Sequence, residues 1–61
     1  MTYQAKAKLQ DSCKKLAKLH NAGIVDVLKT IKNKVALDMY LNELESILGS
    51  RFEYVQRDLN A

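Results

Sequence analysis

The sequence predicts an all-α protein of two to three helices, folded as a helical hairpin or a small bundle. The 61-residue chain has no proline and only two glycines, so residues that readily form helices fill almost all of it. Its apolar residues recur at intervals of three and four, which places them on one face of a helix. Hydrophobic residues make up 48% of the chain and charged residues 28%, a balance typical of a globular protein. We therefore expect one small helical domain over residues 1–61.

The first helix is expected over residues 3–20, with Thr2 as its N-cap. Its apolar stripe consists of Ala5, Leu9, Cys13 and Leu16. The segment Asn21-Ala22-Gly23 is expected to end this helix, because glycine readily adopts the left-handed conformation that closes a helix. His20 would then lie in the last turn, where a basic side chain suits the helix dipole.

Two further helices are expected over residues 24–33 and 35–60. The apolar positions of the first are Ile24, Val27, Leu28, Ile31 and Val35, and those of the second are Leu37, Leu41, Leu44, Leu48, Val55 and Leu59. These two stripes are out of register, so we expect a bend or a short break near Asn33-Lys34.

Gly49 and Ser50 mark a second candidate break. Ser50 and Glu53 have the spacing of a capping box, which would start a new helix. The apolar stripe keeps its phase through Gly49, however. We therefore expect the last helix to continue past this glycine.

The lengths of these helices favour a partner chain. At 1.5 Å per residue the first helix spans roughly 27 Å, whereas residues 24–60 would span roughly 55 Å if unbroken. A simple hairpin would leave much of the last apolar stripe in water. Either the chain bends near Asn33 into a compact three-helix bundle or two chains pair, and we favour the homodimer. The surface for self-association or for another partner is then expected to comprise Tyr40, Leu41, Leu44, Leu48, Phe52, Tyr54 and Val55.

The reactive side chains do not form a catalytic or metal-binding set. Cys13 is the only cysteine, so no disulfide forms within the chain. His20 is the only histidine and lies seven residues further on, roughly 10 Å along a helix, which is too far for a Cys–His pair. A structural zinc site requires four ligands. We expect Cys13 to be a small core residue, and we expect no catalytic residues, metal or cofactor.

Charge divides the chain into two halves. Residues 1–34 contain eight lysines and two aspartates, for a net charge of +6, whereas residues 35–61 contain two arginines and five acidic residues, for −3. The candidate contacts to a nucleic-acid backbone are Lys6, Lys8, Lys14, Lys15 and Lys18. A solvated lysine face is the competing interpretation, since arginine, the usual base reader, is absent from this half. Glu43 and Glu45 are either an acidic contact for a partner or part of a solvated face.

We expect a non-enzymatic regulatory or inhibitory protein that binds a larger protein and is encoded by a phage or plasmid. In size and outline the chain resembles the small helical regulators of plasmids and phages, such as the dimeric hairpin that helps control plasmid copy number. A nucleic-acid-binding regulator and a structural assembly subunit are the alternatives. No apolar run approaches the roughly 20 residues that span a bilayer, and the N-terminus lacks the apolar region of a signal peptide. We therefore expect no membrane partner and a location in the cytoplasm, which for a viral protein is the host cytoplasm.

Overall fold

The computed structural model describes residues 3–61, with side chains from residue 5 onward. Its elements are α1 (Tyr3–Leu16), α2 (Asn21–Lys29), α3 (Lys34–Leu48), a short 3₁₀ helix η1 (Gly49–Arg51) and α4 (Phe52–Asn60). The predicted all-α class is confirmed, and residues 3–61 contain no strand. The predicted N-cap Thr2 lies outside the described residues.

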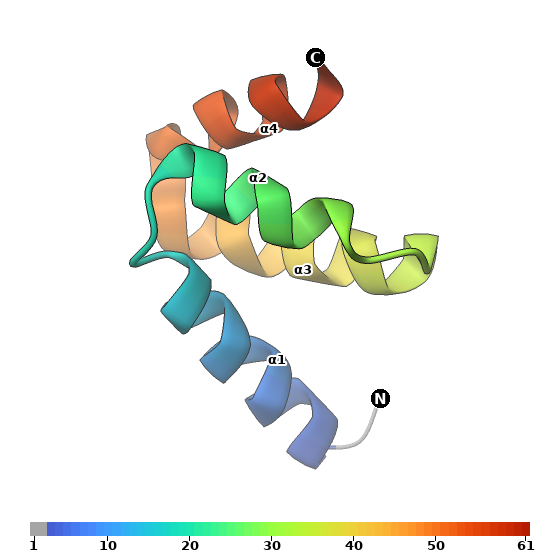
Figure 1. Ribbon diagram of the computed structural model, residues 1–61. Coiled ribbons are helices and arrows are strands. Elements are labelled where there is room, and N and C mark those ends of the chain that lie inside the picture. Colours follow the sequence, from blue (N-terminus) through green and yellow to red (C-terminus); the bar gives the residue numbers. More distant parts are fainter. Residues whose placement is uncertain (1–2) are drawn as a thin grey trace.

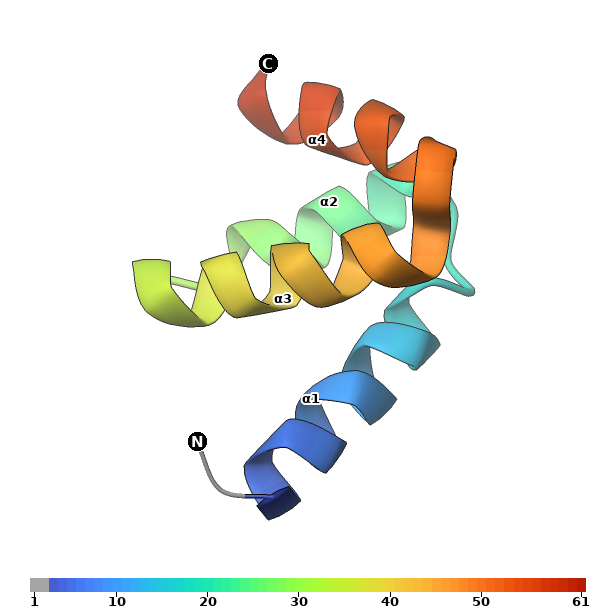
Figure 2. The same cartoon turned by 180° about the vertical axis from the view of Figure 1, so that it is seen from behind.

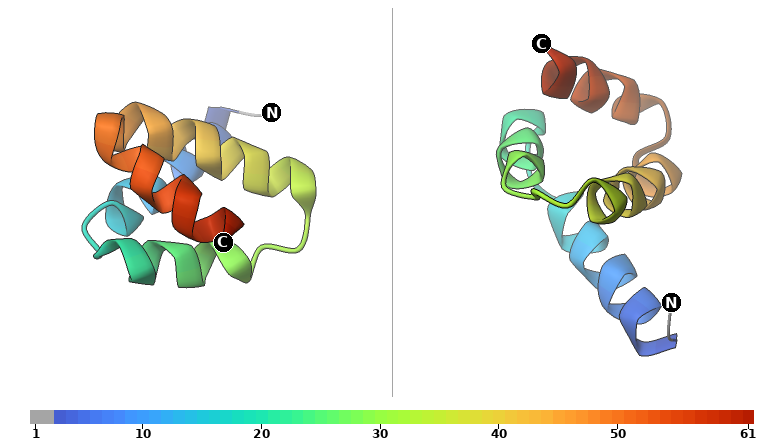
Figure 3. Two further views of the ribbon diagram at one scale, coloured as in Figure 1. Left: turned by 90° about the horizontal axis from the view of Figure 1, so that it is seen from above. Right: turned by 90° about the vertical axis from the view of Figure 1, so that its right-hand side faces the viewer.

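The helices stack in three levels around one core. α2 and α3 run antiparallel in the middle level (Figure 1). α4 turns back over them on one side, as the reverse view in Figure 2 shows. α1 lies on the other side, where it packs against α3 and then diverges from it toward the N-terminus (Figure 3). The chain thus measures 32 × 22 × 15 Å, and α1 is its one projecting arm.

The core lies where all four α-helices meet. Its buried side chains are Cys13 and Leu16 from α1, Ile24, Val25 and Leu28 from α2, Leu44 from α3, and Phe52 and Val55 from α4. Burying a side chain of this size stabilises the fold by about 1.5–3 kcal/mol relative to leaving it in water. The single chain therefore covers its own central apolar residues.

The boundary between the first two helices differs from the prediction. α1 ends at Leu16, and Asn21-Ala22-Gly23 is the first turn of α2 rather than the end of the preceding helix. His20 is the N-cap of α2, because its Nδ1 accepts a hydrogen bond of 2.9 Å from the Gly23 N–H. A Cβ at position 23 would lie 3.0 Å from the His20 ring, so glycine permits this close approach. The glycine was predicted to close a helix, whereas here it helps to start one.

The predicted break near Asn33-Lys34 is confirmed. α2 ends at Lys29, and α3 begins at Lys34. The Asn33 Oδ1 accepts a hydrogen bond of 3.1 Å from the Ala36 N–H and so caps α3. The break occurs where the two apolar stripes lose their common register.

The predicted continuity through Gly49 is wrong. Gly49 adopts φ 60° and ψ −130°, a conformation that only glycine adopts readily, and the chain turns there into η1. No side-chain hydrogen bond caps α4, so the Ser50–Glu53 capping box does not form. The apolar stripe keeps its phase across the turn because α3 and α4 both bury their apolar faces in the same core.

This turn also buries residues that were expected to contact a second chain. Leu44, Phe52 and Val55 were assigned to a partner surface, yet they are only 0%, 5% and 0% exposed within the single chain. They cannot form an external surface in this fold, because α4 folds back and packs Phe52 and Val55 into the same core as Leu44. Pairing of two chains stays a prediction, and it would have to use other residues.

Candidate binding groove

The apolar stripe of α1 is covered only at its C-terminal end. Cys13 and Leu16 are buried, Leu9 is half-buried and Ala5 is exposed. The reason is the direction of α1, which diverges from α3 toward its own N-terminus (Figure 3). The N-terminal half of the stripe is therefore less covered by the rest of the chain than the C-terminal half.

α3 shows the same gradient along its length. Leu44 is fully buried, Tyr40 and Met39 are half-buried, and Val35, one turn before Met39, is 70% exposed. Val35 is the most exposed large hydrophobic residue among the described side chains. Two helices thus bury the ends at which they converge and leave apolar side chains open where they separate.

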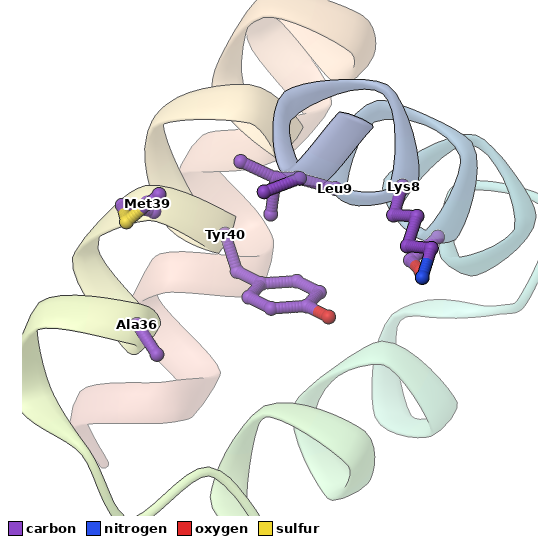
Figure 4. Close-up of a pocket in the computed structure, with 7 residues that line it drawn as sticks. Lys8, Leu9, Ala36, Met39 and Tyr40 are labelled. Atoms are coloured by element: carbon purple, nitrogen blue, oxygen red, sulfur yellow. The ribbon is translucent and has the colours of Figure 1, made fainter. Parts of the chain in front are cut away.

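An open groove of about 290 Å³ lies between α1 and α3 (Figure 4). Its walls are Ala5, Lys8, Leu9 and Ser12 from α1, and Ala36, Met39 and Tyr40 from α3. Leu9 and Tyr40 also pack against the buried core, so the groove is a direct extension of that core. The close-up shows Tyr40 reaching from α3 toward the space beside α1, and Lys8 extending at the rim. Among the described residues of the lining, Lys8 alone is charged.

The guanidinium group of Arg51 holds the segment that follows the C-terminal end of α1, the end from which α1 and α3 diverge. Arg51 in η1 donates hydrogen bonds to the carbonyl oxygens of Ala17 (3.0 Å) and Leu19 (2.6 Å). Its Nε donates a third, of 2.8 Å, to the Asn21 side chain in the first turn of α2. These bonds tie the link between α1 and α2 to the turn between α3 and α4. Arg51 therefore helps to set the angle of α1, and with it the width of the groove.

Cys13 follows the lining residue Ser12 on α1 and contacts α3. It is fully buried, and its Sγ lies 3.8 Å from the Tyr40 carbonyl oxygen on α3. The pKa of this thiol is raised from 9.0 to about 11, mainly by burial and to a smaller extent by the negative charge of Glu43. The reactive thiolate is therefore scarce at neutral pH, in agreement with the predicted role as a core residue.

The predicted lysines do not form one surface. Lys6, Lys8, Lys14, Lys15 and Lys18 are all exposed. Lys8 and Lys15 lie two turns apart on the same flank of α1, whereas Lys6 points roughly 160° away from Lys8. Lys18 follows the end of α1, in the turn before α2. A single nucleic-acid backbone could contact only part of this set.

The two predicted acidic contacts also separate. Glu43 is half-buried and acts on the Cys13 thiol, so it lies on the side of α3 that faces α1. Glu45 is exposed and points roughly 160° away from Glu43, since the two are two residues apart on α3. They do not form one acidic patch.

The remaining predicted partner residues are half-buried or exposed, and they are spread over α3 and α4. Leu41 and Leu48 are half-buried against the core, and Tyr40 lines the groove. Tyr54 is 55% exposed on α4, with the Arg57 guanidinium 5.7 Å from its ring centre. Only Tyr40 of the predicted surface belongs to the groove.

Cys13 and His20 serve separate structural roles. Cys13 is buried in the core, whereas His20 is exposed and caps α2. Among the described residues, no group of three or more histidine, cysteine, aspartate or glutamate side chains could hold a metal ion.

The sequence did not predict most of the groove, nor the three hydrogen bonds of Arg51, which we call the Arg51 clamp. Ala36 lies three residues before Met39 and four before Tyr40, and all three line the groove, whereas Leu37 and Leu41 pack against the core outside the lining. This second apolar stripe on α3 was the available signal. The three bonds of Arg51 join residues at least 30 positions apart, so no local pattern could indicate them.

No protein-family model, curated protein or solved structure matches this chain. None of the helices within the described part of the chain is both long and apolar enough to cross a bilayer.

Proposed function

We propose that this protein is a non-enzymatic regulator that works in the cytoplasm by binding a larger protein in the groove between α1 and α3. The observation that supports the proposal is the groove itself, where an apolar wall that is continuous with the core opens to solvent. Covering such a wall removes apolar surface from water, and this is the main driving force of most protein association. Concave sites lined mostly by apolar side chains with few polar groups are where proteins most often bind their ligands.

The experiment is an affinity pull-down from cell lysate at moderate salt, with and without nuclease, read by mass spectrometry. Two variants accompany the wild type. Met39→Lys places a charge in the groove lining, whereas Val27→Lys makes the same kind of change on α2, at a 37% exposed residue outside the lining. We expect one protein to be captured by the wild type and V27K, with or without nuclease, and lost with M39K. Circular dichroism checks that both variants remain folded.

Equal capture by M39K would place the contact outside the groove. The absence of any captured protein would contradict the proposed function as a whole.

Nucleic-acid binding is the second candidate function, because the lysines of α1 are exposed and uncompensated. Within residues 3–61 the one ion pair joins Arg57 and Glu53, and it involves none of these lysines. α1 contains four lysines and one aspartate, for a net charge of +3. Binding of this kind would weaken by roughly one log unit per log unit of salt for each phosphate neutralised. Capture that is lost on nuclease treatment would favour this function over protein binding.

Self-association is a separate proposal, and light scattering measures it directly. A homodimer would show twice the mass of the chain, whereas a structural assembly subunit would show a large defined oligomer. Either result would leave the pull-down with M39K as the test of the groove.

A further inference from the structure

From the charge and shape of the groove, we infer that its occupant is an amphipathic α-helix of the partner, with acidic residues beside its apolar stripe. This inference rests on the proposed function and specifies the class of partner segment. It combines three features of the described residues: the two helical walls, the length of the apolar lining and the position of Lys8.

The walls favour a helix as the occupant. α1 and α3 converge at one end and separate at the other, and a third helix packs well into the angle between two helices at an interaxial distance of about 8–10 Å. From Ala5 to Ser12 the lining extends seven residues along α1, which is roughly 10 Å or two helical turns. An occupying helix would thus present apolar side chains at spacings of three and four over about two turns.

The charges favour acidic flanks on that helix. Lys8 is the only charged residue among the described residues of the lining. On the same flank of α1, the charge of Lys15 two turns further on is offset by Asp11, which lies between the two lysines. The acidic residue Asp38 is two positions after Ala36 on α3, so it points roughly 160° away from the groove side of that helix. Glu43 is half-buried on the side of α3 that faces α1, but it lies outside the lining. An acidic helix therefore meets the positive charge of Lys8 and no acidic residue among the described residues of the lining.

A second copy of this chain does not supply such a helix. The acidic residues of α4 flank an apolar face formed by Phe52 and Val55, and both are buried in the core of their own chain. The apolar face of α3 is likewise unavailable to a second chain, because Leu44 is fully buried in the core. A second copy would have to unfold its core to present either face, so we commit to a different protein as the source of the helix.

The test uses designed helical peptides and nuclear magnetic resonance of the ¹⁵N-labelled full chain. One stapled peptide carries leucines at spacings of four and three with glutamates on both flanks, and a matched peptide carries lysines in place of the glutamates. We expect the glutamate peptide to shift the resonances of Leu9, Ala36 and Met39. It should bind about two- to fivefold more tightly than the lysine peptide, the range expected for one exposed charge pair.

Lys8→Glu is the matched variant, because Lys8 is exposed and its replacement leaves the core intact. It should reverse the preference between the two peptides. Val27→Glu, which adds the same charge away from the groove, should leave the preference unchanged.

Three results would overturn the inference: no shift at millimolar peptide, shifts confined to residues outside the groove, or the same preference in K8E as in the wild type. Groove shifts that depend on protein concentration without peptide would also overturn it, because they would identify a second copy as the occupant. A partner protein captured by the wild type and lost with M39K, together with any of these results, would leave the proposed function standing.

Discussion

Replacement of Arg51 by alanine should strongly destabilise the fold. The wild-type guanidinium donates three hydrogen bonds, to the Ala17 and Leu19 carbonyl oxygens and to Asn21 Oδ1. A hydrogen bond to a charged group contributes about 1.5–3 kcal/mol. Because the three bonds share one group and the bond to Leu19 is exposed, we expect their total contribution to the free energy of unfolding to be well below three times this value. The expected loss is about 2–3 kcal/mol.

That loss is large for a chain of this size. A domain of 61 residues has a free energy of unfolding of roughly 3–9 kcal/mol at about 0.05–0.15 kcal/mol per residue. The melting temperature should therefore fall by roughly 10–20 °C. Urea unfolding followed by circular dichroism measures the change in free energy, and a thermal melt measures the shift in temperature.

Arg57→Ala is the matched control for this prediction. Arg57 forms an ion pair of 3.5 Å with Glu53, and the two side chains are 68% and 73% exposed. Such a pair contributes about 0.5 kcal/mol or less. Arg51→Lys should fall between the two, because an ammonium keeps the charge but cannot reproduce the planar fork of donors. An R51A variant as stable as R57A would refute the reasoning about the clamp.

Substitutions at three further positions test other parts of the fold. Gly49→Ala should cost about 1–3 kcal/mol in urea unfolding, because φ 60° strains a residue with a Cβ although no atom lies within 4 Å of it; an unchanged stability would contradict this. His20→Ala should cost about 0.5–2 kcal/mol through loss of the α2 N-cap, and His20→Asn should restore most of it. Because the pKa of Cys13 is about 11 in the fold against 9.0 ordinarily, its protonated form is the stabilised one. Its contribution is full below pH 9 and is lost as pH rises through 11, by up to about 2–3 kcal/mol. The stability difference between wild type and Cys13→Ala should shift by that amount over this range, and a constant difference would contradict it.

The sequence predicts the helical class and one of the breaks, because both follow from local spacing. The stripes that meet near Asn33 change phase there, and the change marks the loop. At Gly49 the stripe does not change phase, since α4 folds back onto the same core that α3 lines. Periodicity alone therefore cannot separate a continuous helix from this turn.

The boundary at His20 was mispredicted for a different reason. Asn21-Ala22-Gly23 suits either the end of one helix or the start of the next, and the hydrogen bond between His20 and Gly23 decides between them. The candidate groove was beyond prediction for a third reason. Its residues on α1 and α3 are visible as apolar positions, but their exposure depends on the angle of α1. Long-range bonds from Arg51 help to set that angle.

Site-specific photocrosslinking in cells tests the central claim, that the groove binds a larger protein, most directly. A benzophenone amino acid replaces Val35, which is 70% exposed and directly precedes the lining residue Ala36, or Val27 on α2 as the control. We predict a crosslinked product of one larger protein from position 35 that is absent from position 27 and is lost when Met39→Lys is added. A product of equal yield from position 27, or one that persists with M39K, would contradict the claim.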